Sequence, residues 1–256
     1  MTFDTKVDVI IPNYNETLLL SRAIDSVLIQ GELVNKIIIV DDGSDEKTIQ
    51  YLKSKFSGID GIQVVYSVRH NHPGVMRDIG VNHSDSEWIA FLDADDFWEP
   101  DKLRTQLAFA TENGYQVVCS DANIYRNLEK VGRIYQFKVE PRIDTWRLLK
   151  ENIIINSSSM MRRECFQKIG GYPREYHQRG VEDFSLWLRL SAHFKIGFVN
   201  KPLVNYEDQL NSLGKKQNVN LRNIAILDFI FWSKNRTSRL VRLYSTYYLL
   251  RVIGRA

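Results

Sequence analysis

Apolar and polar positions alternate in blocks along the first hundred residues. Short apolar runs, each suited to a buried strand, are separated by stretches with an apolar residue at every third or fourth position, the spacing of an amphipathic helix. The predicted strands are 7–11, 36–40, 62–67 and 87–92, and the predicted helices are 16–30, 46–56 and 75–83. Strands that alternate with helices predict an α/β fold with a mostly parallel sheet and helices on both faces.

The pattern loosens beyond residue 100. The expected elements are a helix over 101–113, a strand over 116–120, an irregular β excursion over 122–139, a helix over 146–150, a strand over 156–161, helices over 163–169 and 184–193, and a strand over 196–199. No internal repeat or low-complexity linker interrupts them. We therefore expect one body, 1–210, with two halves that meet near residue 100, followed by a helical tail, 211–256.

Composition is that of an ordinary globular protein. Of the 256 residues, 44% are hydrophobic and 25% are charged, which argues against disorder. The two cysteines, Cys119 and Cys165, are too far apart in sequence to suggest a disulfide framework or a metal knuckle, so a reducing compartment is expected. The first seven residues lack the apolar core of a secretory signal, and no apolar run approaches the ~18 residues of a membrane span. These features predict a cytoplasmic protein.

The charge is unevenly distributed. The net charge is +3, whereas 222–256 carries seven basic residues and one acidic residue, or +6, which leaves 3 − 6 = −3 for the rest. A basic tail favours an anionic partner. Nucleic acid is possible in principle, but Leu240, Leu243, Tyr244, Tyr247 and Leu250 share one helical face, which suits an anionic membrane surface as well. The alternative is a terminal helix packed on its own domain or on a second subunit of a homodimer.

An acidic triplet follows the fourth predicted strand. The apolar run 88–92 ends at Asp93, Asp95 and Asp96. On an extended backbone, residues two apart share one side, so Asp93 and Asp95 are expected to converge. Carboxylates this close repel each other unless a cation lies between them, and oxygen ligands suit Mg²⁺ or Mn²⁺, which also hold phosphates. The triplet predicts a metal–diphosphate site; the alternative is a solvated turn before the helix that starts near Asp101.

The other strand ends are also polar. Residues 12–16, 41–44 and 70–74 follow the first three strands, and in parallel sheets ligands bind beyond the carboxyl ends of the strands. No Gly-x-Gly-x-x-Gly follows the first strand, and no Gly-Lys-Ser/Thr motif occurs. The sequence therefore argues against an ordinary dinucleotide site and shows no P-loop signature.

Five segments taken together resemble the family 2 glycosyltransferases of the GT-A (Rossmann-like) fold. They are Val9-Ile10-Ile11-Pro12-Asn13-Tyr14-Asn15, Val40-Asp41-Asp42-Gly43-Ser44, Arg77-Asp78-Ile79-Gly80, Phe91-Leu92-Asp93-Ala94-Asp95-Asp96 and Glu182-Asp183. The resemblance covers about 5–207. It implies an inverting transfer of a hexose or N-acetylhexosamine from a UDP-sugar to a glycan or lipid-linked oligosaccharide, in the synthesis of a surface polysaccharide such as O-antigen, capsule or lipooligosaccharide. It also implies that 1–100 binds the nucleotide-sugar and 101–210 binds the acceptor, with no nucleic-acid partner.

The resemblance assigns roles position by position. Tyr14 is expected to stack on the uracil, Asp42 to accept a hydrogen bond from it, Asp95 to ligate Mn²⁺ or Mg²⁺, and Asp183 to act as the catalytic base. The full set expected to contact the nucleotide-sugar is Pro12, Tyr14, Asn15, Glu16, Asp42, Arg77, Asp93, Ala94 and Glu182. Independently of the resemblance, Arg174 or Arg179 in the loop before Glu182 is expected to contact an anionic acceptor, and the tail is expected to attach the protein to the inner face of the cytoplasmic membrane.

Alternatives remain for these residues. Asp183 precedes an apolar-periodic stretch, so a plain helix N-cap is its structural alternative. Members of the family often carry a His where this chain has Gln209. The metal is therefore expected to be bound by Asp95 and the diphosphate, with Asp208 as a substitute ligand. A sugar nucleotidyltransferase needs a Gly-rich basic loop after the first strand, and a phosphatase needs its acidic pair there; neither is present. A catalytically weak nucleotide-sugar- or glycan-binding module is the remaining rival.

Overall fold

The protein is built on one mixed sheet. The computed structural model describes residues 5–208 and 219–234 together with positions 243, 246, 247 and 250. Strand order in the sheet is β3-β2-β1-β4-β9-β6-β10-β5, with β7 paired to β6 and β8 paired to β10. The α/β class is confirmed.

The first half follows the sequence pattern closely. The strands β1 (Val7–Asn13), β2 (Val34–Asp42), β3 (Ile62–Ser67) and β4 (Trp88–Phe91) pair in parallel, and the helices α1 (Leu18–Leu28), α2 (Glu46–Phe56) and α3 (Pro73–Asn82) connect them. Each predicted element appears within about two residues of its expected bounds. Parallel pairing brings the polar segments after β1, β2 and β4 to one edge of the sheet.

The second half contains β5 (Phe97–Trp98), α4 (Lys102–Asn113), β6 (Val117–Arg126), β7 (Glu129–Arg133), β8 (Arg142–Ile143), α5 (Thr145–Lys150), β9 (Met160–Arg162), α6 (Arg163–Ile169), α7 (Glu182–Ser191) and β10 (Ile196–Glu207). Here the sheet is no longer all parallel. β9 pairs antiparallel with both β4 and β6, and so joins the two halves, whereas β6 and β10 are parallel.

Two predicted strands differ from the observed ones. The predicted strand over 156–161 begins as a 3₁₀ turn, Asn156–Ser158, because the hydroxyls of Ser158 and Ser159 donate to the carbonyls of Ile155 and Asn156 at 2.7 Å and compete with extended backbone. The strand predicted over 196–199 continues to Glu207. Its register shifts around Pro202, which lacks a backbone N–H for the ladder, and this break hid the second part of the strand from the sequence pattern.

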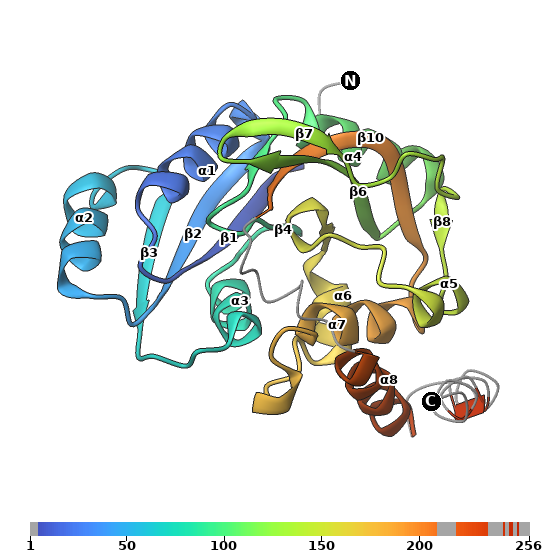
Figure 1. The fold of residues 1–256 in the computed structure, drawn as a ribbon. Coiled ribbons are helices and arrows are strands. Elements are labelled where there is room, and N and C mark those ends of the chain that lie inside the picture. The colour runs from blue at the N-terminus through green and yellow to red at the C-terminus, as the bar shows by residue number, and fades with distance from the viewer. Residues whose placement is uncertain (1–4, 209–218, 235–242, 244–245, 248–249, 251–256) are drawn as a thin grey trace.

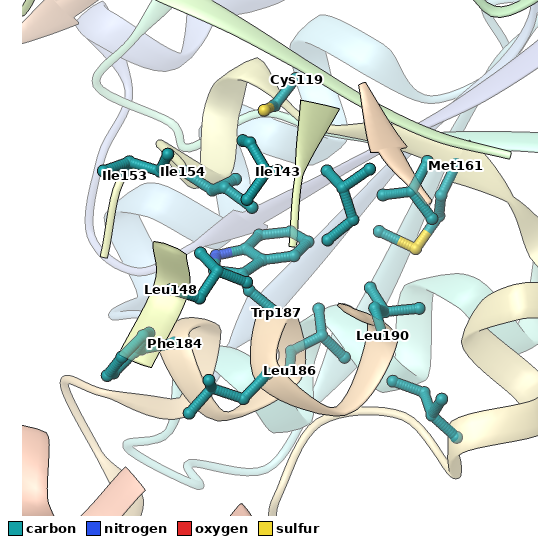
Figure 2. Packing of buried hydrophobic residues seen from close by; sticks show 14 of the residues in the cluster. Cys119, Ile143, Leu148, Ile153, Ile154, Met161, Phe184, Leu186, Trp187 and Leu190 are labelled. Atoms are coloured by element: carbon teal, nitrogen blue, oxygen red, sulfur yellow. The ribbon is translucent and has the colours of Figure 1, made fainter. Parts of the chain in front are cut away.

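Helices cover both faces of the sheet (Figure 1). α1, α2 and α4 pack their apolar stripes on one face, and α3, α5, α6 and α7 lie on the other. Figure 2 shows Trp187 of α7 among Ile143, Leu148, Met161 and Leu190, in the apolar core between the sheet and α5, α6 and α7. This packing holds α7 against the sheet.

The first part of the tail packs on the body. α8 (Val219–Ser233) contributes Ala225, Ile226 and Phe229 to the core beside α7, and Asp228 accepts from both Nε and Nη2 of Arg189. Leu243, Tyr247 and Leu250 are exposed. Gln209, Arg239, Leu240, Arg242, Tyr244 and Arg251 lie outside the described residues. Among the helices of the described residues, none has the length and apolar character to cross a bilayer.

Gly80 sets the distance between α3 and the sheet. A Cβ at this position would overlap Cγ2 of Ile10 and lie 3.2 Å from Cγ2 of Val40. We expect Gly80→Ala to lower stability by about 1–3 kcal/mol, because the overpacking outweighs the better helix propensity of alanine. Thermal melts check this, with Gly132→Ala as the control, since a Cβ at Gly132 meets nothing within 4 Å. An unchanged melting temperature for Gly80→Ala would contradict the close approach.

Candidate active site

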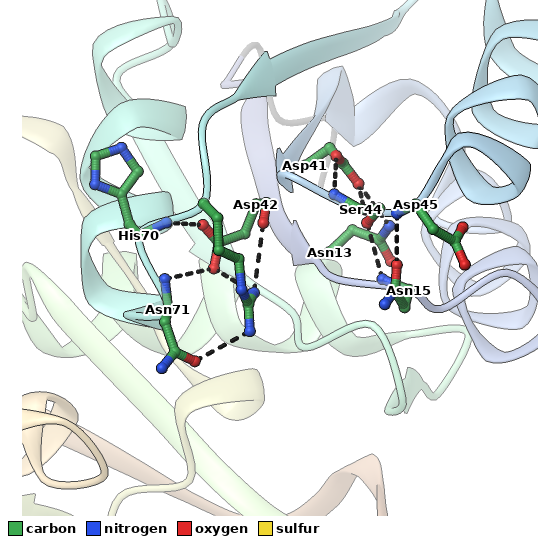
Figure 3. Close-up of polar contacts among 9 residues, drawn as sticks. Asn13, Asn15, Asp41, Asp42, Ser44, Asp45, His70 and Asn71 are labelled. Carbon is green, nitrogen blue, oxygen red and sulfur yellow. Dashed lines mark hydrogen bonds and ion pairs between the residues drawn. The ribbon is translucent and has the colours of Figure 1, made fainter.

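A cleft of about 850 Å³ opens at the carboxyl ends of β1, β2 and β4, and both halves of the chain line it. The sequence-predicted residues that line it are Pro12, Tyr14, Glu16, Asp42, Arg77, Asp93, Ala94, Asp95, Glu182 and Asp183. Asn15 is absent from this lining. It stands at φ 52° and ties two loops together, because its N–H donates to Ser44 Oγ and its Oδ1 accepts from the N–H of Asp45, both at 2.8 Å (Figure 3).

The two aspartates at the end of β2, Asp41 and Asp42, have different roles. Asp41 builds the turn, since its carboxylate accepts from the N–H of Ser44 at 3.0 Å and from Asn13 Nδ2 at 3.2 Å. Asp42 faces the cleft and accepts from the N–H groups of His70 at 2.6 Å and Asn71 at 3.0 Å (Figure 3). Asp41 therefore stabilises the turn, and Asp42 is the member of the pair that lines the cleft.

Tyr14 is not a core aromatic. Its side chain is 48% exposed, and the guanidinium carbon of Arg69 lies 3.3 Å from its ring centroid. Arg69 also pairs with Asp42 at 2.7 Å. Arg69 lies two residues beyond the end of β3, and its sequence position gave no reason to assign it a role.

The acidic triplet forms a tight turn, and its three carboxylates have two different roles. The N–H of Asp96 donates to the carbonyl of Asp93 at 3.1 Å, so the backbone turns here and is not extended. Asp96 is buried, and its carboxylate accepts from Ser157 Oγ at 2.5 Å and from the N–H of Glu207 at 2.9 Å. Ser157 Oγ also accepts from the N–H of Asp93 at 3.0 Å. Asp96 therefore fixes the turn, and Asp93 and Asp95 are left to face the cleft.

Asp95 sits in a strongly negative environment. Burial, together with the nearby charges of Asp93, Glu16 and Glu207, raises the pKa of Asp95 to about 7. Within the described part of the chain, no three His, Cys, Asp or Glu side chains form a ready cation cage. A divalent ion held by Asp95 and by ligand phosphates would relieve this repulsion, so the residues present fit an ion that arrives with an anionic ligand.

Arg77 connects the two halves of the cleft. Its guanidinium is buried, lies 2.5 Å from the Asp93 carboxylate and 3.6 Å from that of Glu182, and is close to Asn156. Asp78 and Glu87, which are near Arg77 in the sequence, pair with Arg174 and Arg162 instead. Nothing in the local sequence around Asn156 signalled its place here.

Asp183 is the second residue of α7, and Val181 is the N-cap, so the plain N-cap alternative is wrong. Asp183 Oδ1 accepts from the N–H of Phe184 at 2.6 Å, and Oδ2 lies 3.5 Å from Asn152 Nδ2. Burial and the adjacent charge of Glu182 raise the pKa of Asp183 to about 7. A half-buried carboxylate with a near-neutral pKa is suited to accept a proton at physiological pH.

Comparisons with known proteins agree with this geometry. Residues 8–170 match the model of glycosyl transferase family 2. The chain belongs to this family. It is 34% identical over 222 residues to the putative teichuronic acid biosynthesis glycosyltransferase TuaG of Bacillus subtilis, covering 82% of each chain. It is 25% identical to the UDP-Glc:alpha-D-GlcNAc-diphosphoundecaprenol beta-1,3-glucosyltransferase WfgD of Escherichia coli, covering 77% of this chain and 74% of the other.

Other relatives are longer. The present chain spans about a third of the length of two Rickettsia glycosyltransferases, with which it shares 29% and 27% identity. The fold matches that of S. aureus TarS 1–349 in complex with UDP-GlcNAc, with a TM-score of 0.74 and 17% identity over 98% of this chain and 72% of that one. This likeness confirms the GT-A fold.

Proposed function

We propose that the protein is an inverting glycosyltransferase that moves a hexose or N-acetylhexosamine from a UDP-sugar to a glycan or lipid-linked acceptor in surface polysaccharide synthesis. The observation that carries the proposal is that Asp95 and Asp183 line the same cleft, and that the pKa of each is raised to about 7. The Asp95 carboxylate is suited to bind a cation together with a diphosphate, and the Asp183 carboxylate is suited to accept a proton. The names of the relatives, and the UDP-GlcNAc in the TarS complex, support a UDP-sugar.

The chain's own groups supply two parts of the reaction. Asp183 accepts the proton of the acceptor hydroxyl, which raises its nucleophilicity, and Asn152 orients the carboxylate. Arg77 holds Asp93 and Glu182 and so fixes the base relative to the donor side. A divalent ion, when bound, stabilises the charge that develops on the departing diphosphate. Attack opposite the leaving group requires the base and the diphosphate site to lie on different elements, and α7 and the turn after β4 meet that requirement.

Arg179 is proposed to contact an anionic group of the acceptor. Its side chain lines the cleft near Asp183, and its buried Nε has no hydrogen-bond partner among the described residues. Arg174 pairs with Asp78 at 2.9 Å and is absent from the cleft lining, so it is the weaker candidate of the two arginines. A phosphate-bearing acceptor, such as the lipid diphosphate in the name of WfgD, fits a free guanidinium donor.

Arg179→Ala should raise the KM for a phosphate-bearing acceptor by about 10- to 100-fold and leave the donor KM unchanged, because a charge-assisted hydrogen bond contributes about 1.5–3 kcal/mol. Initial rates with acceptor sugars that carry or lack the phosphate test this. Arg174→Ala is the control, with both constants unchanged. An equal effect on the uncharged acceptor would remove this role from Arg179.

We also propose that the protein works in the cytoplasm, at the inner face of the membrane. The exposed side chains of Leu243, Tyr247 and Leu250 beside a basic sequence support attachment to anionic lipid. Co-sedimentation with anionic and neutral liposomes tests it. Equal binding to both would contradict an electrostatic contribution of the tail.

Titration calorimetry with UDP, CDP, GDP and ADP, each with and without Mn²⁺, tests the donor class. We expect UDP to bind, and Mn²⁺ to raise the affinity for UDP. Binding of a different nucleotide, or of none, would overturn the assignment of the donor. UDP binding without sugar transfer to any acceptor would favour the binding-module alternative.

A further inference from the structure

Polar side chains on one side of α1 hold the segment that follows β4. Arg22 and Ser26 lie four residues apart on α1 and share one side of the helix, and Gln30 follows four residues later. Gln30 Nε2 donates to the carbonyl of Glu99 at 2.9 Å, and Ser26 Oγ accepts from the N–H of Trp98 at 3.0 Å. Arg22 is the member of this set that reaches the acidic turn.

Arg22 bonds to the backbone that carries the Asp95 side chain. Its Nη2 donates to the carbonyl oxygen of Asp95 at 2.7 Å and to the Glu207 carboxylate at 3.1 Å. Its guanidinium carbon lies over the Phe97 ring, 4.3 Å from the ring centroid. The cleft lining includes Asp95, whereas Arg22 is absent from it. A ligand in the cleft therefore meets Asp95, and Arg22 acts on that ligand only through the turn.

Glu207 holds Arg22 and the turn at the same time. Its side chain is only 8% exposed, so the carboxylate is largely removed from water. Its N–H donates to the Asp96 carboxylate at 2.9 Å. Loss of Arg22 would leave the buried Glu207 carboxylate without its ion-pair partner and the carbonyl of Asp95 without this donor. Both changes cost free energy in place and favour movement of the turn.

We propose that Arg22 is a positioning residue that sets where the Asp95 carboxylate stands relative to a divalent ion. The inference rests on the proposed function, because it requires an ion that binds together with a nucleotide diphosphate. Mg²⁺ accepts little departure from octahedral geometry, so a shift of the backbone at Asp95 weakens the bond to the ion. Loss of a group that orients a metal ligand typically lowers metal affinity by about 10- to 100-fold.

Arg22→Met tests the inference, because position and charge predict opposite results. Methionine keeps the unbranched stem and removes both the donor and the positive charge. Removal of a positive charge near a cation site strengthens cation binding by electrostatics alone. We expect the opposite: the Kd of Mn²⁺ at saturating UDP should rise by about 10- to 100-fold, and the Kd of UDP without Mn²⁺ should stay within about twofold. Paramagnetic resonance of Mn²⁺ and titration calorimetry of UDP measure the two constants.

Two further variants separate the position of the turn from the stability of the fold. Arg22→Lys keeps a donor and the charge on a shorter side chain, and its Kd for Mn²⁺ should lie between those of the wild type and Arg22→Met. Arg133→Met is the matched control. Arg133 also pairs with a buried carboxylate, that of Asp121, and donates to the carbonyl of Asn200 at 2.9 Å, and none of the three lines the cleft. This variant should melt at a lower temperature and bind Mn²⁺ like the wild type.

Other results would overturn the inference. Mn²⁺ binding by Arg22→Met that equals or exceeds that of the wild type would show that Arg22 does not position Asp95, and so would a Kd for Arg22→Lys outside the expected interval. An equal loss of UDP affinity without Mn²⁺, or an equal loss of Mn²⁺ affinity in Arg133→Met, would assign the effect to the whole cleft or to the fold. If the wild-type protein binds no Mn²⁺ in the presence of UDP, the proposed function itself fails.

Discussion

Asp183→Asn is expected to lower kcat by about 10²–10⁴-fold, the usual contribution of a general base, and to leave UDP affinity within about twofold. The amide keeps the shape of the side chain but cannot accept the proton of the acceptor hydroxyl. Steady-state transfer rates and UDP titration of the same preparation provide the two readouts. Asp144→Asn is the control, since Asp144 also accepts a backbone N–H at a helix start, 2.9 Å from the nitrogen of Arg147, but lies outside the cleft lining. A loss of UDP affinity equal to the loss of rate would contradict the role of base.

The pH dependence of kcat/KM is also expected to depend on Asp183. Burial and the charge of Glu182 raise the pKa of Asp183 to about 7, and the base works only when deprotonated. The value of kcat/KM should therefore fall as the pH drops below 7. Glu182→Gln removes the neighbouring charge and should move this limb to lower pH. A limb that does not move would assign the ionisation to another group.

Asp95→Asn is expected to abolish Mn²⁺-dependent transfer and at the same time to stabilise the protein without ligand. The pKa of Asp95 is raised from 3.8 to about 7 in the folded protein by burial and by Asp93. Between these two values the folded state binds more protons than the unfolded state, so this group makes stability fall as the pH rises. One pKa unit corresponds to about 1.4 kcal/mol, so a neutral amide at pH 7.5 should raise the melting temperature by several degrees.

The control is an aspartate whose pKa is shifted in the opposite direction. Asp101 lies outside the cleft, and a hydrogen bond from Lys201 lowers its pKa, so Asp101→Asn should leave stability unchanged or slightly reduced, with full activity. Differential scanning calorimetry at pH 5 and 7.5 separates the two. A melting temperature for Asp95→Asn at or below that of the wild type would contradict the charge repulsion on which the proposed cation site depends.

Much of the donor half of the cleft could be predicted from the sequence because the information there is local. Each buried strand of that half is a short apolar run, and the polar residues of the cleft follow these runs directly. Parallel pairing then brings Asp42 and Asp93 to one edge, and this needs only the order of the elements. The order of five motifs was enough to predict the GT-A fold.

The remainder depends on contacts between distant segments. Asp93, Asp95 and Asp96 look alike in the sequence, and only the bonds from Ser157 and Glu207 separate the carboxylate that builds the turn from the two that face the cleft. The same holds for Arg69, whose place on Tyr14 depends on a contact across 55 positions of the chain. The antiparallel insertion of β9 between β4 and β6 also leaves no signal in a three-residue strand.

Transfer of a sugar from a UDP-sugar in this cleft can be tested directly. The most direct measurement is nucleotide release by the purified protein with Mn²⁺ and a panel of UDP-, GDP-, CDP- and dTDP-sugars, in the presence of acceptor candidates, with Asp95→Asn and Asp183→Asn beside the wild type. We expect the wild type to release UDP from at least one UDP-sugar, and both variants to lose that release. Release from a different nucleotide-sugar, or release that persists in both variants, would contradict it.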